Sequence, residues 1–184
     1  MFELFSIPML LIYSALFGMN MKMADCFNEH GFKWFRGDSI LFGMIFGLFG
    51  GLVIASRPEL TNLYLSLLLV NVLRFRVDRL NHGIAANIMF FGFLLSINNF
   101  MWQYFLYFFI TFAIFGLIMD VISPKVTLNK FWKYLLEIRI FYFVFTFLFS
   151  IYTNIWLVFI SMAIFQLSYN LTSKLAQKSP NYIK

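Results

Sequence analysis

Charged residues are scarce in this chain of 184 amino acids, and their scarcity excludes most classes of protein. Only 12% of the residues are charged and 61% are hydrophobic, so the chain cannot cover a soluble domain with a charged surface. The single cysteine, Cys26, excludes a disulfide framework and a four-cysteine metal site. Residues 1–20 contain no basic residue but do contain Glu3, so we interpret them as a retained span and not as a cleaved signal.

The apolar residues fall into long runs that are separated by short polar gaps. A helix needs roughly 20 residues to cross about 30 Å of hydrocarbon. We therefore predict an all-α, polytopic membrane helix bundle that forms a single integral membrane domain, residues 1–184. Its seven transmembrane helices are expected near residues 4–20, 39–55, 60–77, 83–99, 101–121, 135–153 and 155–171. The third apolar run is short, so a tilted or partly re-entrant segment is an alternative there.

Lysine and arginine gather in alternate gaps between these runs. The gaps that hold them, with the C-terminal tail, contain Lys22, Lys33, Arg36, Arg74, Arg76, Arg79, Lys125, Lys130, Lys133, Lys174, Lys178 and Lys184. The second gap holds only Arg57, and Arg139 is left over just inside the sixth run. Short loops that retain Lys and Arg stay on the cytoplasmic side. The pattern predicts a multi-pass protein of the cell (inner) membrane, with its N-terminus outside and its C-terminus cytoplasmic.

The net charge of +6 is spread over the ends of these loops. Anionic lipid headgroups attract cations in such positions, so we expect membrane lipid as a partner and no nucleic acid. In the second run, Gly43, Gly47 and Gly51 recur at four-residue intervals and share one helix face. Such a face allows another helix to approach closely. It predicts either packing inside one chain or helix–helix self-association, with access for a substrate as a further alternative.

Two of the predicted cytoplasmic loops, residues 22–38 and 74–83, carry more polar side chains than topology requires. They offer carboxylates for a divalent cation and basic groups for phosphate. The residues predicted to be catalytic are Asp78, His82, Glu29 and His30, and those predicted to bind substrate are Lys33, Arg36, Arg79 and Asn81. Asp78 and Asp25 are the predicted ligands of Mg²⁺. The alternative is a pair of solvated loops whose acids merely balance their cations.

The first loop also carries soft ligands, which suggest a second metal hypothesis. The thioethers of Met19, Met21 and Met23, with Cys26 and His30, form a ligand set that suits Cu(I). Alternating residues on a helix do not share a face, however, and this argues against a copper site.

Two stretches resemble the CDP-archaeol synthases, relatives of the CDP-diglyceride synthases. Residues 33–37, Lys-Trp-Phe-Arg-Gly, are similar to the Lys-x-x-Arg-Gly loop of that family, and the preceding Ile7-Pro8 also matches its start. Residues 77–82, Val-Asp-Arg-Leu-Asn-His, are similar to the Leu-Asp-Arg-x-Asp-Ser signature, with amide and imidazole replacing the second acid and the serine. The resemblance implies a membrane cytidylyltransferase in which Asp78 is a metal-site or phosphate-site acid. It also implies that Lys33 and Arg36 contact phosphate.

Together these features predict an integral membrane enzyme that acts on a phosphorylated lipid at the cytoplasmic face. The expected reaction is nucleotidyl or phosphoryl transfer with a divalent cation, on a phosphorylated lipid or nucleotide substrate. The alternative is a non-catalytic membrane protein, either a small-solute transporter subunit or a structural subunit of a membrane complex. No charge lies near the middle of a predicted span, which counts against an ion-driven transporter.

Overall fold

The structure, a computed structural model, describes residues 4–29, 32–75, 77–122, 129, 135 and 139–178. These residues form seven α-helices and no strand, which confirms the all-α prediction. The helices are α1 (Ile7–Glu29), α2 (Asp38–Ile54), α3 (Pro58–Leu73), α4 (Leu80–Leu95), α5 (Trp102–Leu117), α7 (Ile140–Thr153) and α8 (Trp156–Gln177). A 3₁₀ turn, η1 (Ile97–Asn99), follows α4, and α5 continues into a short π-helix, η2 (Ile118–Ile122).

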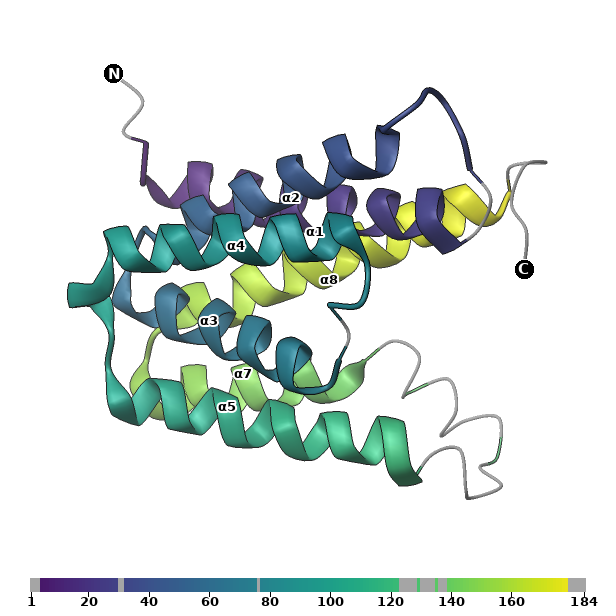
Figure 1. Ribbon diagram of the computed structural model, residues 1–184. Helices are drawn as coiled ribbons and strands as arrows, with labels where there is room; N and C mark the ends of the chain where they lie inside the picture. The colour runs from purple at the N-terminus through teal and green to yellow at the C-terminus, as the bar shows by residue number, and fades with distance from the viewer. Residues whose placement is uncertain are drawn as a thin grey trace.

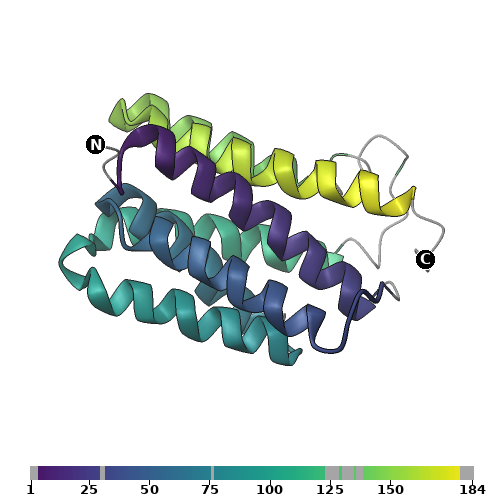
Figure 2. The same ribbon diagram turned by 90° about the horizontal axis from the view of Figure 1, so that it is seen from above.

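The helices lie side by side, and their connections gather at two ends of the bundle (Figure 1). Seen from above, α8, α1, α2 and α4 form a row in that order, with α1 packed on α8 and α2, and α2 packed on α4 (Figure 2). The helices α5 and α7 lie below this row, and α3 packs on α5 while also touching α2, α4 and α8. The helix α3 is therefore central, and Leu60, Leu63 and Tyr64 are fully buried in it.

The polar side chains of α3 are satisfied inside the bundle, which explains how a central helix tolerates them. Thr61 Oγ1 donates to the Ile54 carbonyl at 2.5 Å, and Asn62 Nδ2 donates to the Asn99 carbonyl at 3.0 Å. Buried polar groups need such partners because no water reaches them. Pro58 occupies the first turn, where its missing N–H costs nothing. The doubtful third segment of the sequence is thus a regular helix of 16 residues.

The outer faces of the bundle expose large apolar side chains at helical spacing. On α5 and α7 these are Leu106, Ile110, Ile114, Leu117, Val144, Phe147, Leu148 and Ile151. Soluble monomers rarely expose apolar surface on this scale. Of the described helices, three are long and apolar enough to cross a membrane: Ile7–Asn28, Trp102–Asp120 and Trp156–Gln177. The other four are apolar but shorter, with 14 to 17 residues. These features support a membrane protein.

The glycine face of α2 packs against α4 of the same chain. A Cβ added to Gly47 would lie 2.7 Å from Ala85 Cα, and one added to Gly43 would lie 2.8 Å from Asn81 Cβ. Gly51 meets Gly92 of α4, whose own added Cβ would lie 2.6 Å from the Gly51 carbonyl oxygen. The face therefore serves the packing inside one chain that the glycine spacing predicts. Self-association through Gly43, Gly47 and Gly51 would require α4 to move away.

Two helices run further than predicted. The helix α1 continues to Glu29, so part of the predicted first loop is helical, and α8 continues to Gln177. No proline or glycine lies between Gly18 and Glu29 to end the first helix. Its polar side chains also find partners inside the bundle: Asp25, for instance, bonds to His82 of α4 and Tyr169 of α8. A run of polar residues therefore indicates a loop only where no neighbouring helix provides hydrogen-bond partners for those residues.

Candidate functional site

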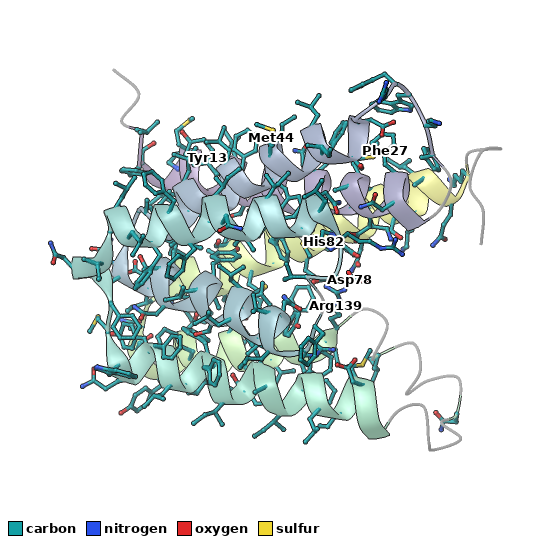
Figure 3. The ribbon with its side chains drawn as sticks, in the orientation of Figure 1. Tyr13, Phe27, Met44, Asp78, His82 and Arg139 are labelled. Carbon is teal, nitrogen blue, oxygen red and sulfur yellow. The ribbon has the colours of Figure 1, made fainter. Side chains whose placement is uncertain are left out.

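A cavity of about 780 Å³ lies between the row of α8, α1, α2 and α4 and the helices below it. It is at the end of the bundle where α1, α3, α5 and α8 finish and α4 and α7 begin. Apolar side chains from the middle portions of the helices line its inner part: Phe17, Phe46, Leu67, Met89 and Phe115. Ionisable side chains from the helix ends line its outer part: Asp25, Arg74, Asp78, His82, Asp120 and Arg139. Figure 3 shows Asp78, His82 and Arg139 close together at this end. The cavity is thus apolar inside and charged at its mouth.

Asp25 joins three helices at this mouth. Its side chain extends from α1, and its Oδ1 lies 2.9 Å from Nε2 of His82 on α4. The hydroxyl of Tyr169 on α8 donates to the other oxygen, Oδ2, at 2.8 Å. This arrangement favours the His82 tautomer with its proton on Nε2, and it fixes the orientation of the ring. A carboxylate that orients an imidazole in this way is a common element of general-base catalysis.

Two cations lie against the ring of Tyr169. Lys22 Nζ is 5.5 Å from the ring centroid and Arg139 Cζ is 5.0 Å from it. Among the residues that the structure describes, neither cation forms an ion pair with a carboxylate. The cluster therefore has the positive charges of Lys22 and Arg139 against the single carboxylate of Asp25. Asp78 and the pair of Arg74 and Asp120 line the same cavity, whereas Lys22 does not.

Arg139 remains charged in this position. Burial acts to lower the pKa of its guanidinium, but Tyr169, Tyr142 and Asp25 outweigh that effect and the pKa is raised. The residue precedes α7 in a left-handed conformation, with a φ of 54°, and Phe75 beside the cavity has the same φ. Non-glycine residues adopt this conformation at a cost, and it is found more often at functional sites.

Arg74 and Asp120 form a second charged contact, an ion pair at the cavity wall. Arg74 Nε and Nη2 donate to the two carboxylate oxygens of Asp120 at 2.7 and 2.9 Å. These hydrogen bonds raise the pKa of Arg74 above its usual value. The side chain of Arg74 reaches Asp120 across Gly116, where an added Cβ would lie 2.5 Å from Arg74 Cδ. Asp120 itself lies in the π-helical segment η2, a conformation that is frequent at functional sites.

The structure brings three of the predicted site residues to this cavity: Asp25, Asp78 and His82. Asp78 is at the rim, with 60% of its side chain exposed, and its Oδ1 is 3.9 Å from Nδ1 of His82. Asp25 approaches the other ring nitrogen, so the imidazole stands between the two carboxylates that were predicted to share Mg²⁺. Within the described residues, no three His, Cys, Asp or Glu side chains form a group that could hold a metal ion.

The other predicted residues lie elsewhere. Lys33 and Arg36 are exposed in the segment before α2 and do not line the cavity. Arg79 is 56% exposed and lies 3.9 Å from Asp78. Asn81, which was predicted to bind substrate, is 1% exposed, packs into the α2–α4 contact at Gly43 and does not line the cavity. The side chain of Glu29 and the whole of His30 lie outside the described residues.

The soft ligands of the copper hypothesis are spread over different surroundings. Met21 lines the cavity, Cys26 is fully buried, and Met19 is 39% exposed. The helix α1 runs through all of these positions, so successive side chains point in different directions. His30, the remaining member of the set, lies outside the described residues.

Sequence reasoning missed Lys22, Tyr169 and the role of Arg139. Lys22 and Tyr169 are far apart in the chain and meet only because α1 packs on α8. Tyr169 follows a long apolar run and carries no signal of its own. Arg139 did carry one, because it is the single cation that the alternation of basic gaps leaves unexplained. Comparisons of the chain with protein-family models, with curated proteins and with solved structures found no match.

Proposed function

We propose that this chain is a multi-pass membrane enzyme that acts on a phosphorylated lipid at the cytoplasmic face. The observation that carries the proposal is the charged guanidinium of Arg139, which forms no ion pair with a carboxylate among the described residues and lies at the mouth of a cavity with an apolar interior. An amphiphile with an anionic headgroup fits both parts of such a cavity. The apolar interior removes hydrocarbon from water, and arginine binds phosphate oxygens with its planar fork of donors.

In this proposed arrangement, all seven described helices cross the bilayer. The turn between α2 and α3, the η1 segment and the turn between α7 and α8 lie at one end of the bundle (Figure 1). The ionisable residues that line the cavity lie at the other end. The alternation of basic residues supports a cytoplasmic position for the cavity end. The shorter helices are roughly 21 to 26 Å long at 1.5 Å per residue. Local thinning of the bilayer and extended polar side chains accommodate that mismatch.

In the proposed chemistry, the residues of the cavity divide the work. Arg139 holds the phosphate and offsets its charge, and Lys22 adds positive charge nearby, beside the ring of Tyr169. His82, held by Asp25, accepts the proton of a hydroxyl nucleophile as its oxygen bonds to phosphorus, while the leaving oxygen departs with the electron pair. Asp78 at the rim would hold a Mg²⁺ ion, which would offset negative charge on the transferred phosphoryl group. Asp25 suits that role less well, because His82 and Tyr169 already occupy its oxygens.

Binding of phosphatidic acid to purified protein in phosphatidylcholine nanodiscs tests the proposal. Arg139→Gln is expected to weaken this binding about tenfold to a hundredfold, because charge-assisted hydrogen bonds contribute roughly 1.5–3 kcal/mol. Arg57→Gln is the matched control, since it removes the same charge at the opposite end of the bundle and should leave binding unchanged. Equal binding by the wild type and Arg139→Gln would contradict the proposal.

Turnover is tested with the same material by mass spectrometry of the lipid after incubation with Mg²⁺, alone and with each nucleoside triphosphate. A phosphorylated product that disappears in His82→Gln supports the enzyme. Binding that depends on Arg139 but yields no product in any arm would favour the non-catalytic alternative, in which the chain holds the lipid without changing it.

A further inference from the structure

A second, smaller cavity of about 180 Å³ lies between α3 and α5. Its lining is Val70, Leu73, Arg74, Ala113, Leu117 and Asp120. Leu73 and Leu117 are exposed on the outer surface of the bundle, at 63% and 58%. Arg74 and Asp120 line the main cavity as well. The two cavities therefore share this charge pair as a common wall, with one cavity on the inside of the bundle and the other toward its surface.

The contact between Arg74 and Gly116 determines how close α3 and α5 lie at this shared wall. The absence of a side chain at Gly116 lets the methylene stem of Arg74 lie directly on α5. Nε of Arg74 lies 2.7 Å from Oδ2 of Asp120. Only the apolar stem of Arg74 is therefore left beside the aliphatic side chains that line the small cavity. Long basic side chains commonly offer such an apolar stem to hydrocarbon while their charge is satisfied elsewhere.

We propose that the pocket between α3 and α5 binds the hydrocarbon chain of the amphiphile whose headgroup occupies the main cavity. This inference rests on the proposed function for the position of the headgroup. The chain passes along the stem of Arg74 and leaves the bundle between Leu73 and Leu117, toward the lipid. A hydrocarbon chain fits this pocket for two reasons. The pocket shares Arg74 and Asp120 with the main cavity, where the headgroup of the amphiphile would lie, and the rest of its lining is aliphatic.

The test compares three probes on protein in phosphatidylcholine nanodiscs: ethyl phosphate, octyl phosphate and octanol, with empty nanodiscs correcting for partition. Leu117→Trp fills the small pocket. Ile110→Trp places the same ring two turns earlier on α5, where the residue is 52% exposed and does not line either cavity. Neither residue belongs to the headgroup site. Melting of both variants is measured to exclude unfolding.

The wild type is expected to bind octyl phosphate more tightly than ethyl phosphate. Leu117→Trp should keep the affinity for ethyl phosphate but lose about tenfold for octyl phosphate, the equivalent of roughly two buried methylenes. Ile110→Trp should match the wild type. An unchanged affinity of Leu117→Trp for octyl phosphate would overturn the inference and leave the proposed function standing.

Octanol tests the hydrocarbon pocket independently of the anionic headgroup site. If ethyl phosphate does not bind even to the wild type, the anionic headgroup site is wrong. Octanol binding that Leu117→Trp weakens and Ile110→Trp does not would then still support the hydrocarbon pocket. Octanol binding that is equal in all three proteins would overturn the pocket as well.

Discussion

The two ends of the bundle solve the same problem, the closing of helix ends, with different chemistry. At the end that contains η1, neutral groups make the connections: Asn62 bonds with the backbone of Asn99 and Met101, and Ser96 donates to the Ile54 carbonyl. At the other end, charged groups join the helices through Asp25, His82 and the Arg74–Asp120 pair. The neutral end is closed by short turns, whereas the charged end surrounds the 780 Å³ cavity.

The difference shows where each kind of bond is useful. Neutral hydrogen bonds lose little when they are removed from water, so they can close an end tightly. Charges keep part of their hydration and need room, and they also attract a charged ligand. We therefore expect substitutions at the neutral end to change stability, and substitutions at the charged end to change mainly the binding and chemistry of a ligand.

The largest effect is expected at the contact between α2 and α4, two helices that run from one end of the bundle to the other. Gly47→Leu should destabilise the protein by at least about 3 kcal/mol, because the new side chain meets the backbone of Ala85 and forces α2 away from α4. Thermal unfolding in detergent measures the loss. Gly83→Leu is the control, since no atom lies within 4 Å of a Cβ added there. Equal melting of Gly47→Leu and the wild type would mean that α4 does not cover this face.

At the neutral end, Asn62→Leu should cost about 2–4 kcal/mol of stability and leave phosphatidic acid binding unchanged. The substitution leaves the Asn99 carbonyl and the Met101 N–H without their side-chain partner, and each such loss costs roughly 1–3 kcal/mol when buried. Asn87→Leu, an exposed amide with one local bond to the Gly83 carbonyl, is the control. A loss of lipid binding in folded Asn62→Leu would erase the proposed division between the ends.

At the charged end, Asp25→Asn should separate binding from chemistry. An amide accepts from only one of His82 and Tyr169, so stability should fall by about 1–3 kcal/mol. Loss of the carboxylate leaves Lys22 and Arg139 less compensated, so an anion should bind as well or better, while turnover falls because His82 is no longer oriented. Titration and product analysis on the same sample measure both. Anion binding weakened tenfold or more would instead indicate a metal ligand.

The smallest effect is expected for Asp78→Asn, with changes in stability of about 0.5 kcal/mol or less. Asp78 is 60% exposed and its contacts with Arg79 and His82 are both 3.9 Å long, so the exposed pair contributes little. Phosphate binding without metal should be unchanged. A loss of turnover that depends on the Mg²⁺ concentration would support the metal role that the sequence predicts for this residue.

The sequence predicted the helices and their order well, because apolar runs with polar or proline-containing turns leave few alternatives in such a chain. It also predicted the close packing of the Gly43–Gly47–Gly51 face. It did not anticipate the burial of Asn81, whose backbone and Cβ lie beside Gly43 while its amide donates to the Ala24 carbonyl. It failed again at α1, where polar residues indicated a loop although α4 and α8 provide their partners. Contacts between distant helices decide such cases, and one chain's local pattern does not contain them.

The pairing of α1 with α8 has a consequence for biosynthesis. Asp25 and Ser14 of α1 bond to Tyr169 and Ser161 of α8, and α8 leaves the ribosome well after α1. At roughly 5–20 residues per second, α1 waits on the order of ten seconds for α8. During that interval its polar face is presented to lipid or to whatever machinery inserts the chain. A ribosome-stalled chain that ends before α8 should therefore be degraded quickly or be found bound to a membrane chaperone.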